Sequence, residues 1–219
     1  MADFTPVQRA KNALDNRKLN LSCKCPADQS KWSSLIWGLY ANNPRITVYT
    51  GDPSDQGESK GYGKITANLD LPTFYAFLQA MYEVIDSEGE FKTKLENKNF
   101  IFPQGKRSEK PVNVSDLWFG KDKDGIIWIS VTARDRPKIK FTFGPTEFHN
   151  FVNGDGSQAS PAKISKLYAK AYVKILENMM TNMAVDNYVE PPKRDQPAGG
   201  IRNYSAHKQN TAVDDDLPF

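Results

Sequence analysis

Alternating apolar and polar positions predict a run of β-strands in the first third of the chain. The segment Trp32–Ala41 is rich in aromatic and branched side chains, which favour strands. Arg45–Thr50 and Gly61–Leu69 each place apolar side chains at every second position, which is typical of a half-buried strand. The polar residues 51–60 between these two segments are typical of a loop. We therefore expect three strands before residue 70.

The period of the pattern becomes helical at residue 70. Asp70 is suited to cap a helix N-terminus, and Pro72 falls in the first turn, where a proline is tolerated. Apolar residues then recur at helical spacing and share one face: Phe74, Phe77, Leu78, Met81, Val84 and Ile85. This face predicts a helix that closes a barrel end or covers a sheet.

Strand patterns return after Gly89 and predict a second β region. Its segments are Phe91–Phe102, Val112–Phe119, Ile126–Arg134 and Lys138–Phe143. The Asp-Gly pair within residues 121–125 predicts a hairpin turn between the second and third of them. In the third segment, Trp128 and Arg134 fall on the side opposite the isoleucines. In the fourth, Lys138 and Lys140 point outward.

A second helix is expected from Ser160 to about Val185, opened by the Ser160-Pro161 pair. Its predicted apolar stripe is Ile164, Leu167, Tyr168, Ala171, Ile175 and Met179. Residues 191–213 are polar and rich in proline and glycine at their start, which predicts a disordered linker. The expected organisation is one domain over residues 1–190, this linker, and a short tip over residues 214–219.

The order of these elements favours a mainly β fold with two helices. Three strands, one helix and then more strands is the order of an OB-fold, a Greek-key barrel that binds oligonucleotides on one face. We expect an OB-fold-like Greek-key barrel with extra strands and a C-terminal helix. A β-sandwich with two helices stays open as the alternative.

Positive charge is concentrated in one part of the chain. The net charge of the 219 residues is only +3, yet residues 92–140 hold 12 basic and 6 acidic side chains. A local basic field is the footprint expected of a site for a polyanion. A solvated face with extra lysines is the alternative that charge alone leaves open.

Basic and aromatic residues offer the two contacts that hold single-stranded nucleic acid, which are cations on phosphates and rings stacked on bases. The candidate cations are Lys64, Lys92, Lys94, Lys98, Lys106, Arg107, Arg134, Lys138 and Lys140. The candidate stacking residues are Tyr49, Tyr62, Trp118 and Trp128. Packing in the core or on the sheet is the alternative for each ring, and we expect Trp32 and Trp37 in the core.

The sequence lacks the patterns of catalytic and metal sites, so we expect neither an enzyme nor a cofactor. Gly61–Lys64 contains glycines without the spacing of a phosphate-binding loop. Cys23 and Cys25 are distant in sequence from His149 and His207, whereas a zinc site needs about four ligands. We interpret the cysteines as ordinary cytosolic thiols.

No apolar stretch approaches the length that crosses a bilayer, and the first residues carry no apolar signal region. We therefore expect a cytoplasmic protein without a membrane partner. The sequence leaves homo-oligomerisation open.

The last six residues combine an acidic triplet with Leu-Pro-Phe, which is typical of a peptide displayed for another protein. They resemble the acidic tip of bacterial single-stranded DNA-binding proteins, which ends in an aspartate-rich run, an aliphatic residue and Pro-Phe. The rest of the chain is similar in overall character to the divergent single-stranded DNA-binding proteins encoded by tailed phages. The resemblance implies that the tip recruits replication and repair proteins of host or phage, through Asp214, Asp215, Asp216, Leu217, Pro218 and Phe219.

These observations lead us to expect a protein that coats and protects single-stranded DNA without sequence preference. The resemblance places this role in phage DNA replication, recombination or repair, in the cytoplasm of a bacterial host. Two alternatives stay open. The first is an adaptor or decoy that occupies host enzymes through the tip, and the second is an RNA-binding module.

Overall fold

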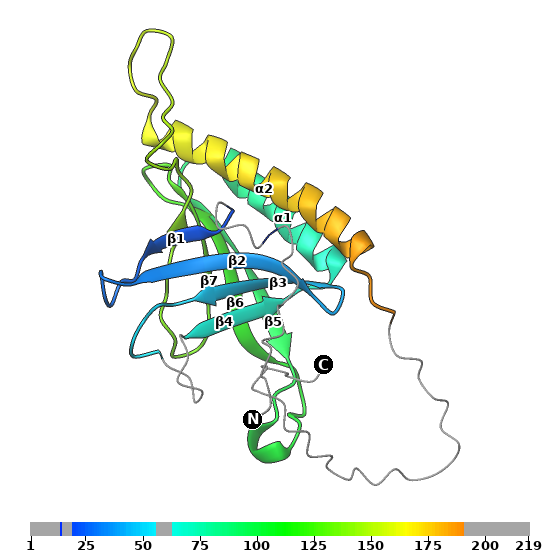
Figure 1. Ribbon diagram of the computed structural model, residues 1–219. Helices are drawn as coiled ribbons and strands as arrows, with labels where there is room; N and C mark the ends of the chain where they lie inside the picture. Colours follow the sequence, from blue (N-terminus) through cyan, green and yellow to red (C-terminus); the bar gives the residue numbers. More distant parts are fainter. Residues whose placement is uncertain (1–13, 15–18, 56–62, 191–219) are drawn as a thin grey trace, which may run out of the picture.

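The computed structural model describes residue 14 and residues 19–55 and 63–190, which form two antiparallel sheets and two long helices (Figure 1). The first sheet has the order β1 (Leu21–Lys24), β2 (Trp32–Tyr40), β3 (Asn43–Tyr49) and β4 (Lys64–Asn68). The second has the order β5 (Phe91–Asn99), β6 (Val112–Lys121), β7 (Ile127–Thr132) and β8 (Phe141–Thr142). A short 3-10 helix, η1 (Pro103–Gly105), lies between β5 and β6.

The two helices, α1 (Leu71–Asp86) and α2 (Pro161–Asp186), lie side by side (Figure 1). The carboxylate of Asp70 accepts a hydrogen bond from the backbone N–H of Thr73 at 2.7 Å, so the predicted cap of α1 is confirmed. The Ser160 hydroxyl caps α2 in the same way. Neither helix is long and apolar enough to cross a membrane, and this holds for every helix in the described part of the chain.

One apolar core joins both sheets and both helices. All six residues predicted for the apolar face of α1 are buried. The inward sides of β6 and β7 add five fully buried residues, Leu117, Phe119, Ile127, Ile129 and Val131. Each such side chain contributes about 1.5–3 kcal/mol by leaving water, so the two strands are held firmly against the helices.

The predicted stripe of α2 is only partly correct. Ile164 is buried, and Tyr168 and Met179 pack partly against the core, but Leu167 and Ile175 are 40% and 36% exposed. The helix is turned so that the residues facing the core are Ile164, Ser165, Ala169, Tyr172, Val173, Leu176, Met180 and Met183. Apolar residues occur on more than one side of α2, so spacing alone did not decide between the faces. Tertiary packing decides it, since the Tyr172 ring meets the Phe143 ring at a centroid distance of 5.2 Å.

The mainly β fold with two helices is confirmed, and the predicted strands are present with one addition. The short strand β1 was not predicted. In the segment 138–143 only Phe141–Thr142 forms a strand, although burial alternates along the whole segment as predicted. Within the described ranges no ladder joins the two sheets into a closed barrel. The predicted linker and tip, residues 191–219, lie outside the described residues.

The two β2 tryptophans have opposite environments. Trp37 is 2% exposed and packs edge-on against Phe74, as predicted for a core residue. Trp32 is 59% exposed, so its predicted core position was wrong. Side chains alternate along a strand, and the neighbour of Trp32, Ser33, is the one that is buried.

An ion pair connects the loop after β3 with the segment after β7. The guanidinium of Arg136 donates to both carboxylate oxygens of Asp55, with Nη2 and Oδ2 2.9 Å apart, and to the carbonyl of Lys64 at 3.2 Å. The Asp55 side chain is 8% exposed and also accepts from the Thr50 hydroxyl. Burial favours a raised pKa, but the hydrogen bonds from Arg136 and Thr50 outweigh it and hold the pKa of Asp55 below its usual range.

Replacing Arg136 by alanine is expected to lower the free energy of unfolding by about 1–3 kcal/mol, because a buried carboxylate loses its donor. Urea unfolding at neutral pH measures this loss. Arg134→Ala is the matched control, since the Arg134 side chain is 93% exposed. Equal losses in the two variants would contradict a specific role for the pair.

The same pair gives a pH dependence of known sign. The pKa of Asp55 is lower in the folded state, so the stabilisation is complete above the unfolded value of about 4. It is lost as the pH falls through the folded-state pKa. The difference in stability between wild type and Arg136→Ala is therefore expected to narrow in acid.

Candidate functional site

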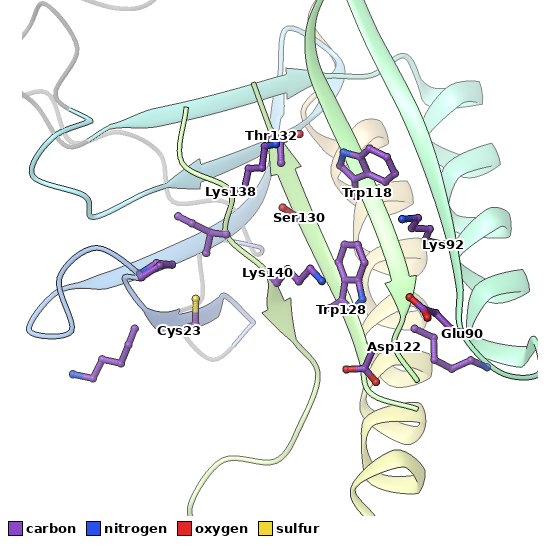
Figure 2. A pocket seen from close by; sticks show the side chains of 14 residues that line it. Cys23, Glu90, Lys92, Trp118, Asp122, Trp128, Ser130, Thr132, Lys138 and Lys140 are labelled. Carbon is purple, nitrogen blue, oxygen red and sulfur yellow. The ribbon is translucent and has the colours of Figure 1, made fainter. Parts of the chain in front are cut away.

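A groove of about 580 Å³ lies on the outward face of the second sheet (Figure 2). Strands β5, β6 and β7 contribute to it from one side, and the end of β1 and the segment before β8 contribute from the other. Its lining residues are Cys23, Lys24, Pro26, Glu90, Lys92, Trp118, Lys121, Asp122, Trp128, Ser130, Thr132, Lys138, Ile139 and Lys140.

Strand alternation places the aromatic residues of the groove. In β7 the isoleucines at 127 and 129 face the core, so Trp128 and Ser130 between and beside them face outward. In β6, Leu117 and Phe119 face the core and Trp118 faces outward. Both tryptophans therefore stand on the groove side, as the sequence predicted for Trp128.

Trp128 forms the floor of the groove. It is paired with Gly120 across the β6–β7 ladder, and its ring lies over that glycine. A Cβ atom on Gly120 would be only 2.4 Å from Cζ2 of Trp128, so the indole needs the missing side chain. As a result Trp128 is 8% exposed, so most of this ring packs on the sheet, which is the alternative that the sequence left open.

Lysines lie close to both rings. The Lys140 ammonium is 4.4 Å from the centroid of the Trp128 ring. Those of Lys92 and Lys94 are 5.9 and 5.5 Å from the centroid of the half-buried Trp118 ring. A cation within about 6 Å of an indole face is attracted by the electrons of the ring. These contacts hold the ammonium groups beside the aromatic surfaces.

The groove has an excess of positive charge. Five lysines line it, at positions 24, 92, 121, 138 and 140, against the two carboxylates of Glu90 and Asp122. Asp122 serves the hairpin turn, because its carboxylate accepts the backbone N–H groups of Asp124 and Ile126. Among the described residues, Lys92, Lys138 and Lys140 have no carboxylate within ion-pair distance. Their charges are therefore available to a ligand.

Lys121 differs from the other lysines of the groove. Its ammonium donates to the carbonyl of Ser87 at the end of α1. Burial lowers the pKa of Lys121, and the nearby positive charge of Lys166 lowers it further. This lysine connects the sheet to α1 and is a weaker candidate for a phosphate contact.

Two predicted cations, Lys94 and Lys98, are paired with acidic neighbours. Their ammonium groups lie 2.7 and 3.0 Å from the carboxylate of Glu96, and Lys94 is also 3.7 Å from that of Asp116. Hydrogen bonds from the two lysines lower the pKa of Glu96 to about 2. The group carries no net charge, so a phosphate would have to compete with these carboxylates.

The structure places the other predicted residues that it describes outside this groove. Lys106 and Arg107 follow η1 in the β5–β6 connection, where the Arg107 guanidinium lies 3.6 Å from the centroid of the Phe100 ring. Arg134 lines an adjoining hollow that shares Trp118, Thr132 and Lys138 with the groove. Tyr49 and Lys64 face each other across the β3–β4 ladder of the first sheet, and Tyr62 lies outside the described residues.

Of the predicted contacts, five therefore meet in one place: Lys92, Trp118, Trp128, Lys138 and Lys140. Sequence reasoning missed the wall formed by Cys23, Lys24 and Pro26, because β1 has only four residues and its alternation is too short to be distinctive. It also missed Gly120. A glycine in a strand interior, with a tryptophan in the following strand, was the signal that could have revealed it.

The cysteines have different environments. Cys23 is half-buried at the groove, and Cys25 is fully buried. Burial raises the pKa of the Cys23 thiol, and the neighbouring Cys25 raises it further. Within the described part of the chain no group of three or more metal-ligating side chains comes together.

Gly120→Ala is expected to push the Trp128 indole away from β6 and to expose it. The expected result is a red shift of tryptophan emission and stronger quenching by acrylamide. Gly144→Ala is the matched control, because an added Cβ there would meet nothing within 4 Å. In a Trp128→Phe background, Gly120→Ala is expected to leave the emission unchanged, and a persisting shift would contradict the assignment to Trp128.

Comparisons of this chain with protein-family models, with curated proteins and with solved structures found no match. The function of the groove is therefore inferred from its own residues and geometry.

Proposed function

We propose that this protein binds single-stranded DNA without sequence preference, and that the groove on the second sheet is its binding site. The observation that carries the proposal is the meeting of two outward-facing tryptophans with lysines that have no acidic partner among the residues that the structure describes. A groove that combines cations with aromatic surfaces suits an unpaired strand, whose phosphates and base faces are both accessible.

The residues of the groove divide the work in a definite way. Lys92, Lys138 and Lys140 meet the phosphates. Trp118 is half-buried and presents part of its ring to a base, a contact that contributes about 1–3 kcal/mol. Trp128 is the floor against which a sugar or base edge rests, because only 8% of it is exposed. Few neutral hydrogen-bonding side chains line the groove, which supports binding without sequence preference.

We also propose that the body of the protein is OB-like, a fold that suits this role. Four strands, β1–β4, precede α1, which is one more than in the order of an OB-fold. A meander followed by a helix and further strands still supports the proposal of an OB-like body, a fold that binds oligonucleotides. We further propose that in the cell the protein coats and protects single-stranded DNA during phage DNA replication, recombination or repair. An RNA strand has the same phosphates and base faces, so RNA is the second candidate ligand.

Lys138→Ala/Lys140→Ala is expected to weaken binding of oligothymidylate by about tenfold or more, since two phosphate contacts are lost. The slope of log affinity against log salt should flatten by about 0.7 for each lost contact. Fluorescence titration at several salt concentrations measures both quantities, and single-stranded DNA, duplex DNA and RNA of one length compare the ligands.

Lys170→Ala/Lys174→Ala is the matched control. Both residues lie on α2, which packs against the core, and neither lines the groove. If both double variants weaken oligothymidylate binding equally, the net charge of the protein, and not the groove, determines binding. Binding of none of the three nucleic acids would leave the adaptor or decoy function as the better proposal.

We also propose that residues 214–219 recruit replication and repair proteins. Replacing this segment by a scrambled sequence of the same composition is expected to abolish partner binding, because pocket contacts of Leu-Pro-Phe depend on residue order. Affinity for single-stranded DNA is expected to stay unchanged. Deletion of the segment should leave that affinity unchanged or raise it. Pull-down with purified replication proteins and DNA titration measure the two effects, and retained capture by the scrambled tip would contradict recruitment.

A further inference from the structure

Trp32 is an exposed indole on the outward face of the first sheet. It opens β2, and 59% of its surface is accessible to solvent. The inward positions beside it are filled by Ser33 and Leu35, both fully buried, so the core offers Trp32 no place. An indole costs free energy when it is exposed to water, and this cost supports a binding role for Trp32.

A second ring and a cation accompany Trp32. The Lys24 ammonium lies 4.3 Å from the centroid of its ring, and the two residues are paired across the β1–β2 ladder. Tyr49, 36% exposed, is paired with Ser34, two positions along β2 from Trp32. Two-residue spacing places Trp32 and Tyr49 on the same face as diagonal neighbours, where side chains are about 7–8 Å apart. This face therefore carries two aromatic rings with a lysine at one side.

Lys24 connects this face to the groove. The same residue lines the groove on the second sheet, and β1 lies next to β8. A single-stranded nucleic acid that leaves the groove past Lys24 would therefore reach Trp32 first and Tyr49 next. The residue that joins the two sites, Lys24, belongs to β1, the edge strand of the first sheet.

We propose that Trp32 and Tyr49 form a second stacking platform for single-stranded DNA, and that Lys24 guides the strand to it from the groove. The inference rests on the proposed function of the groove. It predicts that short oligonucleotides occupy the groove alone, and that longer ones also cover the outward face of the first sheet. The binding site of the protein then extends over both sheets.

The test is a titration of Trp32→Ala with oligothymidylates of increasing length, between about 4 and 16 nucleotides, the range of site sizes known for one OB-fold. The variant should bind the shortest oligonucleotides like the wild type and the longest about fivefold or more weakly. Trp32→Phe should recover most of the loss, because a phenyl ring still stacks. Phe148→Ala is the matched control, since Phe148 is an aromatic residue that is 81% exposed elsewhere in the chain.

Three outcomes decide the matter. Unchanged binding of Trp32→Ala at every length overturns the platform, while a loss in Trp118→Ala in the same titration keeps the groove. If Trp32→Ala weakens the binding of short and long oligonucleotides equally, the separate platform is overturned and Trp32 belongs to the groove site. Photo-crosslinking of wild-type protein to iodouracil-containing oligonucleotides gives an independent reading. Crosslinks at Trp32 with long but not short oligonucleotides support the platform, and their absence with long ones overturns it.

Discussion

The alternation of side chains along β6 and β7 is the constraint on which both the core and the groove depend. Leu117, Phe119 and the isoleucines of β7 anchor one side of these strands beneath the helices. The same backbone presents Trp118 and Trp128 on the other side. A shift of register by one residue would exchange the two sets, so the buried side fixes the groove as firmly as it fixes the core. The two tryptophans of the groove are thus held by rigid strands, whereas Lys138 and Lys140 come from the irregular segment before β8.

Sequence reasoning succeeded where one local pattern had one interpretation. The cap at Asp70, the apolar face of α1 and the alternation around Trp128 follow from spacing alone. It failed where tertiary contacts choose between equal options. The face that α2 turns to the core depends on the packing of Tyr172 against Phe143. The environment of Trp32 depends on its position as the first residue of β2. In both cases the residue type favoured burial and the packing overrode it.

The site was predictable in composition and not in shape. Charge counting located the basic segment, and strand alternation already places Glu96 on the same face as Lys94 and Lys98. Only the fold shows that Asp116 of β6 joins this group, and that Lys92 has no carboxylate within ion-pair distance among the described residues. Charge counting also could not show that residues 24 and 140, far apart along the chain, line one groove. Effective charge at a surface depends on which carboxylates the fold brings near, and that information is long-range.

The thiol of Cys23 gives the groove a chemical handle. Of the two cysteines in the chain, Cys25 is fully buried, so a maleimide or a spin label has one accessible target at the wall of the groove. The raised pKa of Cys23 means that labelling is slow at neutral pH and proceeds in mild base, where the thiolate forms. A fluorophore or nitroxide attached there would report on the arrival of a ligand without any engineered residue.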